Sequence, residues 1–258
     1  MVAMPIQRDL WPEKRPNMAL QGAIQAAKSV PERAQPGDIW ACGAHRVLCG
    51  DSTNGAAVAR LLAGARVSAC VTDPPYGVKW RTIYRRFSGG VSDKRRNFAP
   101  VAGDAAPFNP EHLLGFKRLV LWGANCYSDR LPRGSWLVWD KRFTNGKAFL
   151  ADAEVAWMNR GHGVYIHSLT SQGFVRPERE IWHPTQKPIA LLEWCLDKVG
   201  AGVTVYDPYC GSGTMLLACE RTHRRCLAVE IEPGYVDVAI TRWERATGHA
   251  AILLERNG

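Results

Sequence analysis

Residues 203–247 read VTVYDPYCGSGTMLLACERTHRRCLAVEIEPGYVDVAITRWERAT, and this stretch decides the fold. It begins with a short apolar strand over 203–206, which ends in an acidic, glycine-rich segment and is followed by a helix. A second apolar strand over 226–229 ends at Glu230, and apolar residues recur at helical spacing in 233–247. Short apolar strands that alternate with helices are typical of a mostly parallel sheet with helices on both faces. We therefore expect a three-layer α/β fold.

The same alternation extends toward the N-terminus. Further strands are predicted over 46–49, 67–72, 119–122 and 136–139, and further apolar runs occur at 154–158 and 164–167. Further helices are predicted over 54–63 and 188–199, the latter with Pro188 as its first helical residue. Residues 1–36 are rich in proline and charge and contain one short predicted helix over 18–29. We expect 1–36 to be a partly flexible arm and 37–258 to be one catalytic domain.

The composition limits the class of protein. The 258 residues include 33 Lys and Arg against 24 Asp and Glu, a net charge of +9, and 46% are hydrophobic. This is enough for one medium-sized domain with a core, and no apolar run approaches the ~18 residues that span a bilayer. The positive charge favours a polyanionic partner without establishing one. We expect a soluble, cytoplasmic protein.

The eight cysteines do not indicate a metal site. No two of them form a C-x-x-C pair, and the seven histidines lack H-x-x-x-H spacing, so we expect no metal. Residues 1–5 do not start a basic region followed by a long apolar one, so we expect the thiols to be reduced.

Acidic residues occur where several predicted strands end, at Asp51, Asp73, Asp207 and Glu230. Ligands of open α/β sheets gather at the carboxyl ends of the strands. In the segment 207–213, two glycines permit a tight turn and the close approach of a ligand, and Glu230 can accept hydrogen bonds from ribose hydroxyls. A simple turn is the alternative. Neither G-x-G-x-x-G nor a Gly-Lys-Ser/Thr follows, so a nucleoside without a pyrophosphate fits better than a dinucleotide or triphosphate.

The most specific signal is Asp73-Pro74-Pro75-Tyr76. Such a segment could be only a surface turn, because Asp-Pro and Pro-Pro are common in turns. At the end of a buried strand, however, Asp73 and the carbonyl of Pro74 can accept the two N–H bonds of a planar amine. The prolines hold these acceptors in place, and Tyr76 can stack on the ring that carries the amine.

Three motifs together resemble a known family. Asp73–Tyr76, His183–Pro188 and Asp207–Thr214 follow in the order characteristic of the β (permuted) class of DNA amino-methyltransferases, and the resemblance covers about 38–247. It implies a Rossmann-like, circularly permuted fold with a seven-stranded sheet and helices on both faces. It also implies transfer of a methyl group from S-adenosylmethionine to an exocyclic amine of a base that has been flipped out of double-stranded DNA.

The resemblance further implies roles for individual residues. Asp73, Pro74, Pro75 and Tyr76 would be catalytic. Lys187 would meet the carboxylate of the cofactor, Asp51 its adenine amine and Glu230 its ribose hydroxyls. The full set implied for the cofactor is Asp51, Asp73, His183, Thr185, Gln186, Lys187, Asp207, Tyr209, Cys210, Gly211, Ser212, Gly213, Thr214 and Glu230.

Basic residues cluster directly after the catalytic tetrapeptide. Residues 78–97 contain seven basic side chains against one acid, interleaved with aromatic rings. A solvated loop is the alternative, but the position favours a mobile, DNA-binding loop over 78–110. We assign target recognition to 141–182. The DNA contacts expected in these two regions are Lys79, Trp80, Arg81, Arg85, Arg86, Lys94, Arg95, Arg96, Lys141 and Arg142.

The target base remains a choice between two amines. Asp73 favours adenine N6, and cytosine N4 is the alternative; an RNA methyltransferase and a catalytically silent DNA-binding regulator are further ones. A bacterial or phage protein of this kind could form a homodimer and could accompany a restriction enzyme.

Overall fold

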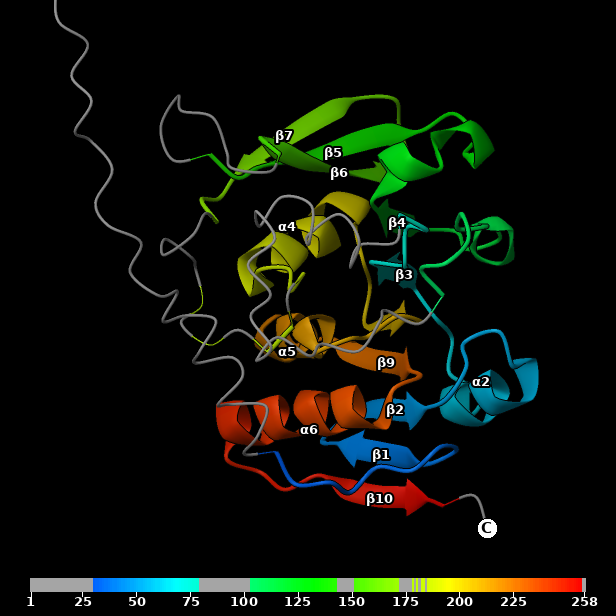
Figure 1. Cartoon of the computed structure of the whole chain (residues 1–258), viewed down its shortest axis with the longest axis vertical. Coiled ribbons are helices and arrows are strands. Elements are labelled where there is room, and N and C mark those ends of the chain that lie inside the picture. Colours follow the sequence, from blue (N-terminus) through cyan, green and yellow to red (C-terminus); the bar gives the residue numbers. More distant parts are fainter. Residues whose placement is uncertain are drawn as a thin grey trace, which may run out of the picture.

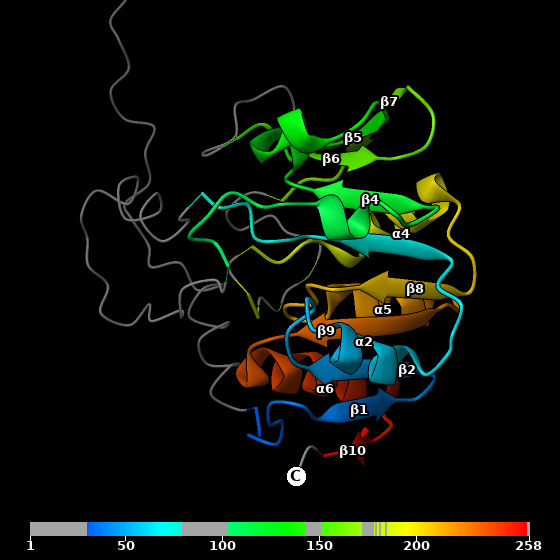
Figure 2. The same cartoon turned by 90° about the vertical axis from the view of Figure 1, so that its right-hand side faces the viewer.

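A computed structural model of the chain describes residues 30–78, 103–142, 151–171, 178, 180, 182, 183 and 185–256. In this part of the chain, ten strands form one sheet in the order β10-β1-β2-β9-β8-β3-β4-β6-β5-β7, stacked in this order in Figure 2. The strands are β1 (Ile39–Cys42), β2 (His45–Cys49), β3 (Ala69–Thr72), β4 (Leu119–Trp122), β5 (Ser135–Asp140), β6 (Ala153–Met158), β7 (Val164–Ser168), β8 (Thr204–Asp207), β9 (Arg225–Glu230) and β10 (Ile252–Glu255).

Four α-helices accompany these strands, and α4, α5 and α6 lie one above another along the sheet in Figure 1. Short 3₁₀ turns η1, η2 and η3 follow β3 and β4. The bounds are α2 (Gly55–Leu62), α4 (Ile189–Val199), α5 (Thr214–Arg221), α6 (Pro233–Thr247), η1 (Glu111–Leu113), η2 (Ala124–Cys126) and η3 (Ser128–Arg130).

Alternate residues of the central strands face two different cores, as the period of a strand requires. On β9, Cys226 and Ala228 pack with α4, α5 and α6, whereas Leu227 and Val229 pack with Leu61 of α2. Both cores are hydrophobic and buried. The expected three layers, with helices on both faces of the sheet, are therefore confirmed.

The sheet differs from the expectation in size and direction. Among the described residues it has ten strands rather than seven, and four of the nine strand pairings are antiparallel. The parallel centre, β2-β9-β8-β3-β4, is extended by β1 and β10 at one edge and by β6, β5 and β7 at the other. β1 and β10 were not predicted, because each is four residues long and turn residues such as Gly43 and Gly248 interrupt the pattern around them.

The parallel centre brings the carboxyl ends of its strands to one edge. Cys49 at the end of β2 pairs with Glu230 at the end of β9, and the amide of Gly50 donates to the Glu230 carbonyl at 2.8 Å. β3 and β8 end beside them at Thr72 and Asp207. Four of the polar positions predicted from the sequence are thus brought to one edge by strand pairing alone.

Capping side chains and prolines mark the starts of the helices. The side chain of Asn54 accepts a hydrogen bond from the amide of Ala57 at 3.2 Å and so caps α2. Pro233 occupies the first turn of α6, as expected. Pro188 is the residue before α4 rather than its first helical residue, because its ψ of 142° is extended.

The end of the predicted arm is fixed to α6. The amides of Arg33 and Ala34 donate to the two carboxylate oxygens of Asp237 at 3.1 and 3.0 Å, and the Arg33 guanidinium pairs with both oxygens of Glu244. Residues 1–29 lie outside the described residues. In the described part of the chain, no helix is long and apolar enough to cross a membrane, and no group of three or more His, Cys, Asp or Glu could hold a metal ion.

Candidate active site

The glycine-rich loop between β8 and α5 is shaped by two left-handed glycines. Gly211 has φ +52° and Gly213 has φ +78°. A Cβ on Gly213 would lie 2.7 Å from the Cβ of Ala239, so this glycine permits α5 to begin against α6. A Cβ on Gly211 would meet nothing within 4 Å, and this residue lines the central cavity. The backbone of the loop is therefore open to a ligand at Gly211.

Two buried carboxylates support this loop, and neither has a cationic partner among the residues that the structure describes. Asp207 accepts a hydrogen bond from the Thr72 hydroxyl at 2.6 Å and one from the Tyr209 amide at 3.2 Å. Glu230 accepts from the amides of Gly211 at 2.8 Å and Glu232 at 2.9 Å. Burial raises the pKa of Asp207 to about 7 and also raises the pKa of Glu230.

Asp51 stands apart from these two carboxylates. It is exposed, and one of its oxygens accepts hydrogen bonds from the amide and hydroxyl of Thr53, both at 2.8 Å. It lines the same cavity.

Arg242 is a buried residue that the sequence analysis missed. From α6 its Nη1 donates to the Ser212 carbonyl at 2.5 Å, to the Ser212 hydroxyl at 3.1 Å and to the Thr214 hydroxyl at 3.2 Å. Burial lowers its pKa to about 10. The only sequence signal is a cation on the apolar face of a helix, four residues after Val238. Arg242 thus connects α6 to the glycine-rich loop.

The segment 182–187 folds back on itself beside the loop. The amide and hydroxyl of Thr185 lie 3.3 and 3.0 Å from Nδ1 of His183, and Oε1 of Gln186 accepts from the Trp182 amide at 3.0 Å and from the Ser212 hydroxyl at 3.3 Å. Burial, followed by the nearby Lys187 charge, lowers the pKa of His183 to about 4, so its ring is neutral near pH 7. This neutral ring and Gln186 line the cavity.

The tetrapeptide that follows β3 is held closely at both ends. The Tyr76 hydroxyl donates to Oδ1 of Asp73, and a Cβ on Gly123 would lie 2.0 Å from the Tyr76 ring. Gly123, with φ +68°, therefore leaves the space that this ring occupies. The amides of Gly77 and Val78 both donate to Oδ1 of Asp104, at 2.8 and 3.0 Å.

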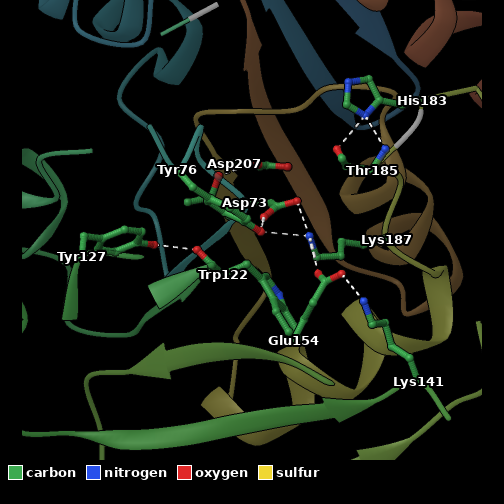
Figure 3. Close-up of polar contacts among 11 residues, drawn as sticks. Asp73, Tyr76, Trp122, Tyr127, Lys141, Glu154, His183, Thr185, Lys187 and Asp207 are labelled. Atoms are coloured by element: carbon green, nitrogen blue, oxygen red, sulfur yellow. Dashed lines mark hydrogen bonds and ion pairs between the residues drawn. The ribbon is translucent and has the colours of Figure 1, made fainter. Parts of the chain in front are cut away.

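Lys187 is buried and lies at the centre of a row of paired charges, shown in Figure 3, whose other members, Asp73, Glu154 and Lys141, are partly exposed. Its Nζ is 2.6 Å from Oδ2 of Asp73, 3.2 Å from the Tyr76 hydroxyl and 3.2 Å from Oε2 of Glu154. The other oxygen of Glu154 accepts from Nζ of Lys141 at 2.9 Å. The Lys187 ammonium, which was expected to meet a cofactor carboxylate, therefore points to the segment Asp73–Tyr76.

The paired charges shift the pKa values of Lys187 and Glu154 in opposite directions. Burial disfavours the charged form of Lys187, but Asp73 and Glu154 outweigh it and raise the pKa of Lys187 well above its usual value. Burial likewise raises the pKa of Glu154, but Lys187 and Lys141 outweigh this and lower it to about 2. Glu154 was also missed; its signal is a single carboxylate within the apolar strand β6.

An aromatic wall, of which only Tyr209 was predicted, completes the site. Phe108 contacts Tyr127 and Tyr209 edge to face, with ring centroids 5.1 and 5.7 Å apart, and the Tyr209 hydroxyl lies 3.3 Å from Nε2 of His112. The glycine-rich loop, the tetrapeptide and this wall surround one cavity of about 1130 Å³. The cavity is lined by Asp51, Asp73, Pro74, Pro75, Tyr76, His183, Thr185, Gln186, Lys187, Asp207, Tyr209, Cys210, Gly211, Ser212, Thr214 and Glu230, whereas Gly213 packs behind the loop.

Most of the expected DNA contacts cannot be located. Lys79, Trp80, Arg81, Arg85, Arg86, Lys94, Arg95 and Arg96 lie outside the described residues. Lys141 is paired with Glu154 and its side chain is only 15% exposed, so it points inward. Arg142 is exposed and pairs with Asp140 at 2.9 Å.

Comparison with known proteins gives matches of one kind. A family described as DNA methylase matches residues 138–241. The type II methyltransferase M.Cfr9I of Citrobacter freundii is 35% identical over 28% of this chain and 27% of its own length. M.HpaI of Haemophilus parainfluenzae is 39% identical over 23% of this chain and 19% of its own length.

The sequence matches thus span about a quarter of these relatives. Among solved structures, the M1.HpyAVI–SAM complex is 20% identical and covers 76% of this chain and 98% of its own, with a TM-score of 0.44. The matched segment 138–241 includes Glu154, Lys187 and the glycine-rich loop. The chain is therefore similar to the DNA methylase family over residues 138–241, which are less than half of its length.

Proposed function

We propose that this protein is a DNA methyltransferase that transfers the methyl group of S-adenosylmethionine to the exocyclic N6 amine of adenine. One observation carries the proposal: Asp73-Pro74-Pro75-Tyr76 and the glycine-rich loop 207–214 line the same cavity, although more than 130 residues separate them in sequence. Its volume of about 1130 Å³ is above the usual range of small-molecule pockets, so it can take a nucleoside cofactor together with a flipped base.

The groups around the glycine-rich loop fit this cofactor. The cofactor supplies a methyl group on a sulfonium, which needs no further activation by the protein. Gly211 exposes backbone, and Glu230 can still accept from ribose hydroxyls because the four lone-pair sites of its carboxylate exceed the backbone amides of Gly211, Ile231 and Glu232 that bind it. Asp51, at the exposed end of the cavity, can accept from an adenine amine.

The tetrapeptide supplies the acceptors for the target amine. The lone pair of an exocyclic amine is delocalised into its ring, and hydrogen bonds from both of its protons make the nitrogen a better nucleophile. Asp73 and the Pro74 carbonyl are the acceptors that this proposal assigns. Lys187 and Tyr76 bind the two carboxylate oxygens of Asp73 in the structure, and the remaining lone pairs of these oxygens can accept an N–H.

The target base must leave the DNA stack to reach this cavity. Tyr76 is the aromatic residue at the tetrapeptide, and we assign it to contact with the extruded base. The basic segment 78–110 and the region 141–182 are assigned to double-stranded DNA, whose phosphates their Lys and Arg side chains can neutralise.

Expression in cells that lack DNA methylation tests the proposal. Modified bases are mapped by single-molecule sequencing in cells that express the wild type or Asp73→Ala. We expect N6-methyladenine at a defined sequence with the wild type and none with the variant. N4-methylcytosine instead would support the proposed methyl transfer but show that the target base is cytosine rather than adenine. Absence of any modified base, or equal modification by the variant, would contradict the proposal.

A further inference from the structure

Lys187 is held by three acceptors that come from three different places in the chain. Its ammonium has three N–H bonds, and three oxygens lie within hydrogen-bond distance: Oδ2 of Asp73, the Tyr76 hydroxyl and Oε2 of Glu154. The Lys187 side chain is only 5% exposed. Every N–H of this buried cation is thus paired, as a buried charge requires.

Glu154 is the member of this set outside the predicted catalytic and cofactor motifs. It belongs to β6, and its two oxygens have separate partners, Oε2 with Lys187 and Oε1 with Lys141 (Figure 3). Without Glu154, one N–H of the buried Lys187 would lose its acceptor, and Lys141 would lose the carboxylate with which it pairs. Leaving one charge of a buried pair without its partner is strongly unfavourable.

We propose that Glu154 is a positioning residue, which acts through Lys187 to hold the Asp73 carboxylate and the Tyr76 hydroxyl in the geometry that methyl transfer needs. This inference rests on the proposed function. Glu154 balances the charge of Lys187, and Lys187 in turn orients Asp73 with lone pairs left for the amine. Lys141 directly follows β5 and pairs with Glu154. The region assigned to target recognition begins at Lys141.

The test is a double-mutant cycle with Glu154→Gln and Lys187→Met. Glutamine keeps the shape of Glu154 but removes its negative charge and replaces one of the two lysine-binding oxygens with an NH2 group, which can only donate. We expect Glu154→Gln to lower the single-turnover methylation rate about 10- to 100-fold, since small displacements of reacting groups have effects of this size. The dissociation constants for S-adenosylmethionine and DNA should stay unchanged. In the Lys187→Met background, Glu154→Gln should have no further effect, because its effect passes through Lys187.

The matched control is Glu244→Gln. Both carboxylate oxygens of Glu244, like those of Glu154, accept hydrogen bonds from a cationic side chain, which is Arg33. Glu244 does not line the cavity. The control should keep the wild-type rate. Multiplicative loss in the double variant, or an unchanged rate in Glu154→Gln alone, would overturn the inference.

A crystal structure of Glu154→Gln gives a readout that does not depend on turnover. We expect Nζ of Lys187 to lose its hydrogen bond to at least one of Asp73 and Tyr76. If both contacts persist, Glu154 does not position them and the inference fails. Failure of the proposed function would instead appear as absence of methylated product with the wild-type protein.

Discussion

The two walls of the cavity hold their carboxylates in opposite ways. On the wall of the glycine-rich loop, Asp207 and Glu230 accept hydrogen bonds from backbone amides and a hydroxyl, and burial raises their pKa values. On the proposed catalytic wall, Asp73 and Glu154 are partly exposed and paired with lysine, and the pKa of Glu154 is lowered to about 2. The wall of the glycine-rich loop thus holds its carboxylates with neutral donors, whereas the other wall holds them with ion pairs.

This difference agrees with the two tasks that we propose. A cofactor is bound and released, and neutral donors and acceptors can serve it with little electrostatic cost. Groups that must be preorganised for a reaction benefit from strong and specific partners. Variants that disturb one wall at a time can test whether the two tasks are separate.

Gly123→Ala should have the largest effect and should affect the catalytic wall. The new Cβ would lie 2.0 Å from the Tyr76 ring at a φ of +68°, so the ring or the backbone must move. We expect at least about a 100-fold loss of the single-turnover rate, because a displacement of about 1 Å can have this effect. Isothermal titration with S-adenosylmethionine should give an affinity near that of the wild type.

The control for this variant is Gly55→Ala, at the start of α2, where a Cβ would meet nothing within 4 Å. It should keep the rate. A wild-type rate in Gly123→Ala would show that the position of the Tyr76 ring is not required.

Arg242→Met should affect the other wall. Methionine fills similar space but cannot donate to Ser212 or Thr214, so the glycine-rich loop loses the charged hydrogen bonds that the two N–H groups of Nη1 share among three acceptors. We expect the affinity for S-adenosylmethionine to fall about tenfold or more, because bonds to charged groups contribute about 1.5–3 kcal/mol each. Arg221→Met, which removes an exposed arginine of α5, is the control. An unchanged affinity in Arg242→Met would contradict the role of Arg242 in the loop.

Asp207→Asn should change how stability depends on pH. The pKa of Asp207 is about 7 in the folded protein and near 3.8 in the unfolded chain. Between pH 4 and 7 the unfolded chain releases this proton first, so the favourable contribution present at low pH is lost as the pH rises. The difference amounts to a few kcal/mol, at about 1.4 kcal/mol for each unit of pKa shift.

Asparagine can still accept the hydrogen bonds of Thr72 and Tyr209, since both go to one oxygen of Asp207. Denaturant unfolding should therefore show the variant gaining stability relative to the wild type from pH 4 to pH 7. A constant difference across this range would show that Asp207 does not titrate there.

Arg142→Ala should have the smallest effect and should leave both walls intact. Arg142 is exposed at the end of β5 and is assigned to a DNA phosphate. We expect unchanged cofactor affinity, weaker DNA binding, and a slope of log affinity against log salt that is reduced by about one. If the slope does not change, Arg142 makes no phosphate contact.

Local sequence patterns predicted much of the parallel centre of this fold. The runs 119–122 and 226–229 are apolar and end in turn residues, and such strands can be recognised without their neighbours. β1 and β10 are short edge strands whose pairing depends on contacts far along the chain. Their antiparallel addition also turned the expected mostly parallel sheet into a mixed one.

The candidate site was predictable where its residues are contiguous. Asp73–Tyr76 and Asp207–Thr214 carry their chemistry in one short segment each. Glu154 and Arg242 act through partners 33 and 30 residues away, and neither belongs to a motif. A charged residue on the buried face of a strand or helix is the signal that would have found both.

The most direct test of the central claim uses purified protein, S-adenosylmethionine with an isotopically labelled methyl group, and unmethylated duplex DNA. The DNA is digested to nucleosides and analysed by mass spectrometry, with Asp73→Ala in parallel. We predict labelled N6-methyl-2′-deoxyadenosine from the wild type and none from the variant. No labelled nucleoside with the wild type at saturating cofactor and DNA, or the same amount with Asp73→Ala, would contradict the account.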